Sequence, residues 1–471
     1  MKPDNDSPQQ GLLSTFAAGC LLIASISYLL KALGLVDIWP LTGIALLLYA
    51  VPGLHRLPIQ VYFLMGFTSV ALVSVIVGDG LAWSAIGEGV NRGAFLMFFL
   101  VAFALMGDVA RSSPMIHRCG EVVVSQPPTR RYAVLTVAAH ILSILVSLGT
   151  GNLFGTIIDR ATNGKAAQNN PQLAKIRRRR MTTAVLRGLS TPALWSPTTL
   201  IVGILLAATP DLRLNDVVPT GLLVMLLMLF SGWLLDWLTR PRPSVVSASA
   251  HYAEFKDLIS FLPLIGLIMM LLLGALLLEH LLPVRQITAL ILSVILVALS
   301  WLVVQHREQR HALKSAVGQL QGSWVNMLNR PRGEIVLVSL AGLLSVLVSL
   351  LLSAEDMGKF VAWTGLTEAS TLILMSMLII VLGNLGITPL VSIALAIESV
   401  WKIPGLDFNP ALVFLCFTGT WSLYTMGSLA SVTLRILTLA VGEKVPTVVG
   451  WNLVFCGFWL IMLYSVVYAF A

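Results

Sequence analysis

Residues 191–200 read TPALWSPTTL and interrupt an apolar run, 183–209, that is longer than one membrane crossing requires. Pro192 and Pro197 each lack a backbone donor and crowd the preceding helical turn, so this closely spaced pair predicts local unwinding. Unwound backbone at membrane depth needs hydrogen-bond partners in the protein or in a wet cavity. The stretch therefore predicts a broken helix that is buried inside the protein.

The composition places this broken helix in a membrane protein. Of the 471 residues, 57% are hydrophobic and 11% are charged, and the mean hydropathy is +0.88, which excludes a soluble globular domain. A helix needs about 20 apolar residues to cross a bilayer. The apolar runs that meet this need are 11–31, 38–54, 61–78, 93–107, 183–209, 217–238, 258–280, 286–304, 335–352, 410–437 and 446–470. We therefore expect an all-α polytopic membrane protein with about 11 transmembrane helices.

Two further apolar segments, 132–159 and 367–400, each contain a glycine-rich polar step. The steps are Gly149-Thr-Gly-Asn152 in the first segment and Gly383-Asn-Leu-Gly386 in the second. Non-helical backbone of this kind is tolerated at membrane depth only where protein or water surrounds it. We interpret both segments as re-entrant hairpins with their tips inside the protein.

The charged residues predict the orientation of the chain. There are 30 basic and 22 acidic residues, a net charge of +8, and the basic residues concentrate in 109–131, 160–182, 239–257 and 305–333. Basic loops stay in the cytoplasm, so we expect a bacterial inner-membrane (plasma-membrane) protein with a cytoplasmic N-terminus and an outside C-terminus. The first hairpin then enters from the cytoplasm and the second from outside. Because orientation accounts for the basic charge, including the Arg177–Arg180 run, we expect no nucleic-acid partner. The expected partners are a small anionic solute and membrane lipid.

Three sequence echoes indicate that one unit is used twice. Asn152-Leu153 recurs 232 residues later at Asn384, the 191–200 stretch lies over 420–429, and the Val-Pro-Thr that begins at Val218 recurs at Val445. Echoes between halves whose hairpins enter from opposite sides are typical of an inverted-topology repeat. The expected organisation is a tail and first span at 1–37, a repeat at 38–238, a linker at 239–257 and a second repeat at 258–471.

The candidate binding residues lie at the two hairpin tips and in the two broken runs. We expect the run 410–437 to break between Thr418 and Ser428, with Gly419 and Gly427 supplying the backbone freedom that proline supplies in the first run. Half-helix N-termini suit an anion, and hydroxyl and carbonyl oxygens suit a hard cation such as sodium. We expect each tip to pair with the break that follows it. The expected ligands of substrate or coupling ion are Thr150, Gly151, Asn152, Ser190, Thr191, Pro192, Ser196, Thr198, Asn384, Thr388, Thr418, Thr420, Ser422, Thr425 and Ser428.

This arrangement of hairpins and broken helices resembles the ion transporter superfamily, which includes divalent anion/sodium symporters and arsenite and citrate permeases. The local matches are Thr191-Pro192 to Thr199 and Met426-Gly-Ser-Leu-Ala430. The resemblance implies a homodimer, elevator-like movement, and symport of a small anionic solute with sodium or a proton. The hairpin tips lack the Ser-Asn-Thr triplet of the dicarboxylate branch, so the resemblance does not extend to dicarboxylate specificity.

Several alternatives remain open at this point. A polytopic membrane enzyme acting on a lipid-linked substrate, of the polymerase or ligase type, or a non-transporting subunit of a complex would share the hydropathy. The sequence contains no P-loop, zinc motif or nucleophile elbow, so we expect no enzymatic activity, metal or cofactor beyond the coupling ion. His140 is interpreted as a packed histidine, Arg187 and Arg435 as snorkelling side chains as readily as anion ligands, and Glu398 as a solvated helix end.

Overall fold

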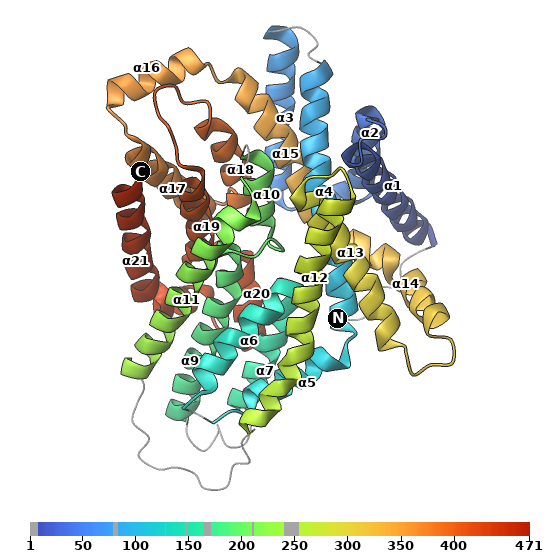
Figure 1. Ribbon diagram of the computed structural model, residues 1–471, viewed down its shortest axis with the longest axis vertical. Helices are drawn as coiled ribbons and strands as arrows, with labels where there is room; N and C mark the ends of the chain where they lie inside the picture. Colours follow the sequence, from blue (N-terminus) through green and yellow to red (C-terminus); the bar gives the residue numbers. More distant parts are fainter. Residues whose placement is uncertain are drawn as a thin grey trace.

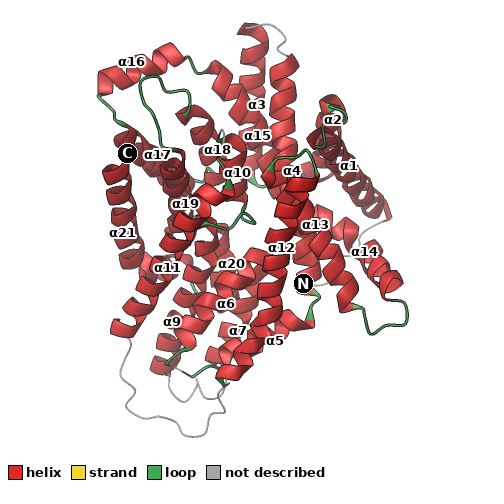
Figure 2. Ribbon diagram, viewed as in Figure 1, coloured by secondary structure: helices red, strands yellow, loops and turns green. Residues whose placement is uncertain are grey.

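The computed structural model describes residues 8–78, 83–127, 129–146, 149–163, 171–209, 212–239 and 254–471. Within these ranges every regular element is a helix (Figure 2). The expectation of an all-α polytopic membrane protein is confirmed. Most of the expected linker, residues 240–253, lies outside the described residues.

The helices of the first half are α1 (Pro8–Ala32), α2 (Trp39–Ala50), α3 (Ile59–Gly78), α4 (Trp83–Arg111), α5 (Pro114–Val124), α6 (Arg131–Val146), α7 (Gly149–Asn163), α9 (Pro171–Ser190), α10 (Leu200–Ala208) and α11 (Leu214–Thr239). Those of the second half are α12 (Leu262–Leu281), α13 (Gln286–Gln305), α14 (Ala312–Asn329), α15 (Arg332–Leu351), α16 (Ala354–Thr364), α17 (Glu368–Asn384), α18 (Pro389–Val400), α19 (Pro410–Gly427), α20 (Val432–Val441) and α21 (Val445–Phe470). Short 3-10 turns are η1 (Val51–Arg56), η2 (Thr191–Leu194) and η3 (Phe255–Phe261).

The number of simple spans is smaller than expected. In the described ranges nine helical segments are long and apolar enough to cross a membrane, or ten if the pair α16 and α17, bent by 104°, counts as one span. The runs 38–54 and 183–209, which were expected to be spans, do not form helices that are long and apolar enough to cross a membrane. The first ends as a helix at Ala50, because Pro52 and Gly53 convert its last residues into the 3-10 turn η1. The second is divided by its own break.

Helices of matching length follow one another in the same order in each half. The 11-residue helices α5 and α16 each precede a hairpin, α6–α7 or α17–α18. A helix that stops at a break comes next, followed by a short helix of 9 or 10 residues and a closing helix of 26 residues. The α6–α7 hairpin lies in the lower half of the molecule, with α5, whereas α17 and α18 lie in the upper half beneath α16 (Figure 1). The two hairpins therefore approach the centre from opposite ends.

The ends of several helices border the segments in which the basic residues concentrate. Helix α9 begins and α11 ends at the lower end of the view, near α5, whereas α21 finishes in the upper half (Figure 1). These lower helix ends border the basic segments 109–131, 160–182 and 239–257. The described parts of these segments, which include α5 and the first turns of α9, therefore lie in the lower half of the molecule (Figure 1).

Helices α4 and α15 cross with their backbones in near contact. A Cβ atom on Gly342 would lie 2.6 Å from the backbone nitrogen of Gly93, and one on Gly93 would collide with the carbonyl oxygen of Ser339. Small residues at such a crossing let membrane helices approach closely enough for dispersion contacts to stabilise the pair. Because α15 also packs against α3 and α18, this crossing joins the two halves of the chain.

The crossing yields a stability prediction. We expect Gly93→Ala to lower the free energy of unfolding by about 1–3 kcal/mol, because the added methyl group pushes the two backbones apart. Gly66→Ala on α3 is the matched control, since a Cβ there meets nothing within 4 Å and alanine is the better helix former. Thermal unfolding of the purified protein measures both. Equal effects of the two substitutions would contradict the close crossing.

Candidate functional site

The first broken helix is present where the sequence predicts it. Helix α9 ends at Ser190, η2 follows, and α10 begins only at Leu200. Inside the break the Pro192 carbonyl accepts hydrogen bonds from the backbone nitrogens of Trp195 at 3.2 Å and Ser196 at 2.7 Å. This tight turn replaces the regular helical pattern, as the paired prolines require.

The second break lies further along the chain than expected. Helix α19 continues to Gly427, and the break comprises Ser428 to Ser431 before α20 begins. The predicted unwinding at 418–425 is wrong, because the hydroxyls there donate back to carbonyls one turn earlier and leave the helix intact. These bonds run from Thr418 to Phe414 at 2.8 Å, from Thr420 to Cys416 at 2.6 Å and from Thr425 to Trp421 at 2.8 Å.

The tip of the first hairpin is the first turn of α7. Residues 147 and 148 lie outside the described residues, and Gly149 to Asn152 are already helical. Thr150 is fully buried, and its Oγ1 atom has no hydrogen-bond partner. Asn152 is exposed. Gly151 lies between Leu189, at the end of α9, and Thr433, at the start of α20.

The tip of the second hairpin holds the second break directly. The Asn384 Oδ1 atom accepts hydrogen bonds from the Ser428 hydroxyl at 3.0 Å and from the Leu429 backbone nitrogen at 3.3 Å. The chain then turns through Gly386, whose φ of +101° favours glycine, and Thr388 precedes α18. The pairing of this tip with the break that follows it is therefore as expected.

Matching hydrogen bonds connect each hairpin to its neighbouring broken helix. His140 Nδ1 on α6 is 2.8 Å from Thr191 Oγ1, and Ser376 Oγ on α17 is 2.6 Å from Thr420 Oγ1. Thr191 and Thr420 are the residues aligned by the sequence echo. The first pair joins α6 to η2, where the first break opens, and the second joins α17 to α19, which precedes the second break. We call the His140–Thr191 and Ser376–Thr420 pairs the two latches.

The surroundings of His140 define its tautomer. Trp195 Nε1 donates to His140 Nε2 at 3.3 Å, so Nε2 is the unprotonated nitrogen. The Nδ1–H group then donates to Thr191 Oγ1, whose own proton goes to the Gly188 carbonyl at 3.0 Å. Each ring nitrogen of this buried histidine thus has a partner, which agrees with its interpretation as a packed residue.

The second arms of the hairpins reach across to the other half of the chain. Helix α7 packs against α20, and α18 packs against α10. A Cβ on Gly155 of α7 would collide with the Ala440 side chain, so the α7–α20 contact also depends on a small residue. Each hairpin is thereby clamped between the broken helix of its own half and the short helix of the other half.

The remaining expected ligands bond locally. Ser190 donates to the Arg187 carbonyl at 3.0 Å, and Ser196 and Thr198 share a hydrogen bond of 2.9 Å. Ser422 is the exception, because its hydroxyl lies 3.9 Å from the sulfur of Met228 on α11. Among the residues that the structure describes, no group of three or more His, Cys, Asp or Glu is placed to hold a metal ion. Oxygens of hydroxyl, amide and backbone groups are what this region offers a cation.

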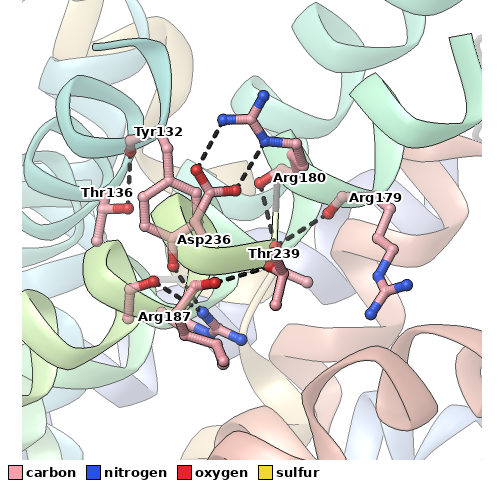
Figure 3. Close-up of polar contacts among 10 residues, drawn as sticks. Tyr132, Thr136, Arg179, Arg180, Arg187, Asp236 and Thr239 are labelled. Atoms are coloured by element: carbon pink, nitrogen blue, oxygen red, sulfur yellow. Dashed lines mark hydrogen bonds and ion pairs between the residues drawn. The ribbon is translucent and has the colours of Figure 1, made fainter. Parts of the chain in front are cut away.

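Arg187 is a structural centre that the sequence interpretation missed. It is buried on α9, where its guanidinium donates to Asn452 Oδ1 at 3.1 Å, Tyr132 Oη at 2.8 Å and the Gly232 carbonyl at 3.3 Å. It also lies 4.1 Å from the centre of the Phe455 ring, a favourable cation–π distance. Figure 3 shows it beside Tyr132, with the Arg180–Asp236 pair nearby. Arg187 therefore neither snorkels nor serves as a free anion ligand in this structure. Its hydrogen bonds join α9 to α6, α11 and α21.

Glu398 is likewise different from the expected solvated helix end. Its carboxylate is 2.6 Å from Arg92 on α4, and Arg92 also donates to the Ala207 carbonyl at the end of α10, at 2.7 Å. Arg285 donates to the same carbonyl at 3.0 Å. These contacts connect the second hairpin and α10 to α4 and to the α12–α13 turn. Arg435, in contrast, is exposed, as snorkelling would have it.

Comparison with solved structures identifies the architecture. The chain is similar to the YdaH transporter of Alcanivorax borkumensis, with a TM-score of 0.50 and 13% identity over 87% of this chain and 98% of that one. This chain shares its fold with a transporter. MtrF of Neisseria gonorrhoeae, from a class of antimetabolite efflux pumps, matches with a TM-score of 0.45 and 11% identity over 87% and 94% of the two chains. No family model matches the sequence, and no curated protein matches it. At 13% identity the likeness to the YdaH transporter establishes the fold and leaves the substrate open.

The first latch gives a second prediction. Thr191→Val removes the acceptor of the buried His140 Nδ1–H group, so the free energy of unfolding should fall by about 1–3 kcal/mol. Thr156→Val on α7 is the matched control, because that threonine is exposed and its substitution should change stability by less than about 0.5 kcal/mol. Denaturant or thermal unfolding in detergent measures the stability of both variants. A Thr191→Val protein as stable as the Thr156→Val control would show that the His140–Thr191 hydrogen bond does not stabilise the fold.

Proposed function

We propose that this protein is a secondary active transporter of a small anionic solute, coupled to sodium or to a proton, with no enzymatic activity. The observation that carries the proposal is the pair of helix breaks, each tied to a re-entrant hairpin, with the hairpins coming from opposite ends of the molecule. Broken helices and hairpins that meet in the interior are how secondary transporters place backbone amides and carbonyls around a solute. The shared fold with a transporter supports the same conclusion.

The anion preference is argued from the helix starts at this region. Helices α10 and α18 pack together, and the residues that precede them are Thr199 and Thr388. Neither threonine caps its helix with a side-chain hydrogen bond. Uncapped N-termini carry partial positive charge and unpaired amide groups, which suit an anion. The buried Thr150 Oγ1 atom without a partner supplies a further polar group at the other tip. Solute and coupling ion are proposed to bind among these groups.

The proposed movement follows from the clamping of the hairpins. Because each hairpin packs against helices of both halves, hairpins and broken helices should move as one body against α4 and α15, in the manner of an elevator. An inverted repeat at 38–238 and 258–471, a homodimer, membership of the ion transporter superfamily, and an inner-membrane location with a cytoplasmic N-terminus complete the proposal. The described basic residues on α5 and at the start of α9 lie toward the lower end of the molecule, which supports that orientation.

Transport by reconstituted protein tests the proposal. In proteoliposomes offered a panel of labelled carboxylates and inorganic oxyanions, an imposed sodium or proton gradient should drive uptake of at least one of them. Asn384→Ala should lower that uptake by about tenfold or more, because removing the hydrogen bonds that position the second break costs of the order of 1.4 kcal/mol. Thr150→Val should also lower uptake if that hydroxyl contacts solute or ion.

The matched control is Asn326→Ala on α14, an exposed asparagine far along the chain from both tips. It should transport as the wild type does. The transport proposal would be overturned if neither a sodium nor a proton gradient increased the uptake of any solute in the panel. Normal uptake by both Asn384→Ala and Thr150→Val would instead overturn the assignment of the site while leaving transport intact.

A further inference from the structure

Three arginines meet between α6 and α9 at the lower end of the molecule. Arg131, Arg177 and Arg180, with Tyr132, Leu135 and Met181, line a small cavity of about 20 Å³ that opens at the surface. A space of this size admits one group as large as a water molecule. The cavity is separate from the hairpin tips and the helix breaks.

The hydrogen-bond donors around this cavity are incompletely satisfied. Asp236 on α11 receives two hydrogen bonds of 2.7 Å from Arg180, which pairs that guanidinium with one carboxylate. Arg131 uses its Nε atom to bond the Gln126 carbonyl, a neutral group. The Nε atom of Arg177 is buried and has no hydrogen-bond partner. The Arg177 Nε–H group is therefore a buried donor that is left without an acceptor beside this cavity.

The neighbouring arginines show that this is a specific cluster within the basic run 177–180. Arg178 turns away toward Glu443, at 3.5 Å, and Thr162, at 3.1 Å. Arg179 is exposed. If the run served only to keep the loop in the cytoplasm, its arginines would not need different surroundings, since any basic side chain has that effect.

We propose that the Arg131–Arg177–Arg180 cluster binds the phosphate group of an anionic ligand. One phosphoryl oxygen enters the cavity and accepts from the Arg177 Nε–H group, and the other oxygens stay at the mouth. Planar guanidinium groups match phosphate geometry with paired donors, and basic pockets between membrane helices at the cytoplasmic side are suited to lipid head groups. The source of the phosphate is either an anionic phospholipid or free phosphate, and the experiment separates the two.

The position of the cluster gives this ligand a structural consequence. Arg131 begins α6, whose His140 forms the first latch, and Arg177 and Arg180 lie on α9, which leads to Thr191. A bound phosphate group bridges the ends of these two helices and, through Arg180 and Asp236, α11. Occupancy should therefore raise the stability of the whole protein, because a ligand that binds the folded state alone stabilises it.

Thermal unfolding of the full-length protein tests the proposal in two arms. The first arm compares phosphatidylglycerol with phosphatidylcholine in mixed micelles, and the second compares inorganic phosphate with chloride at equal ionic strength. We expect a rise in the unfolding midpoint of about 3 °C or more in at least one arm. A rise with the lipid alone identifies a head group, and a rise with inorganic phosphate identifies a soluble ligand.

Variants within the same basic run provide the controls. Arg177→Gln should lose the rise, whereas Arg179→Gln, which removes an equal charge from an exposed position, should keep it. Arg177→Lys serves if the glutamine variant does not fold, and it should lose at least half of the rise because an ammonium group cannot supply paired donors. The proposal is overturned if the wild type responds in neither arm, if Arg177→Gln or Arg177→Lys keeps the full rise, or if Arg179→Gln loses it as well.

Discussion

Peptide groups released at a helix break must find partners, and in a bilayer only the protein itself or enclosed water can supply them. The two breaks of this chain, at 191–199 and 428–431, impose that requirement in the middle of two long apolar runs. The hairpins meet it: Asn384 bonds the second break directly, and His140 bonds the residue that opens the first. The remaining helices position the hairpins so that they reach the breaks.

The hairpins also bind the two halves of the chain to each other. Helix α7 of the first half packs against the short helix α20 of the second half, and α18 of the second half packs against the short helix α10 of the first. The hairpin of each half therefore contacts the short helix of the other half. Two polar centres reinforce this arrangement, one around Arg187 and one around Arg92 and Glu398. Charged groups so deep in a membrane protein are costly unless they are paired or hydrogen-bonded, and these are. The same contacts that stabilise the fold thus hold the two broken helices, α9–α10 and α19–α20, together near the proposed site.

The sequence predicted the helical class, both hairpins and the first break, because hydropathy, glycine-rich steps and paired prolines are strong local signals. The second hairpin was placed at 367–400, and its helices run from Glu368 to Val400. The second break was placed between Thr418 and Ser428 but begins only at Ser428, because threonine hydroxyls can bond within a continuous helix as well as line an opened one. The described residues contain nine or ten candidate spans where about 11 were expected, since a run such as 38–54 is apolar enough to cross but contains Pro52. Arg187, Glu398 and the latch at His140 were misjudged or left unused, because their partners lie far away in sequence and only the fold brings them together.

Labelling of single cysteines at the two hairpin tips tests the central claim most directly, because both tip asparagines are exposed. In vesicles of known orientation, a membrane-impermeant maleimide should modify Asn152→Cys from one side and Asn384→Cys from the other. The wild-type protein corrects for its own four thiols, of which Cys456 is partly exposed. Modification of both positions from the same side would contradict hairpins that come from opposite faces, and with them the account of how the two breaks are held.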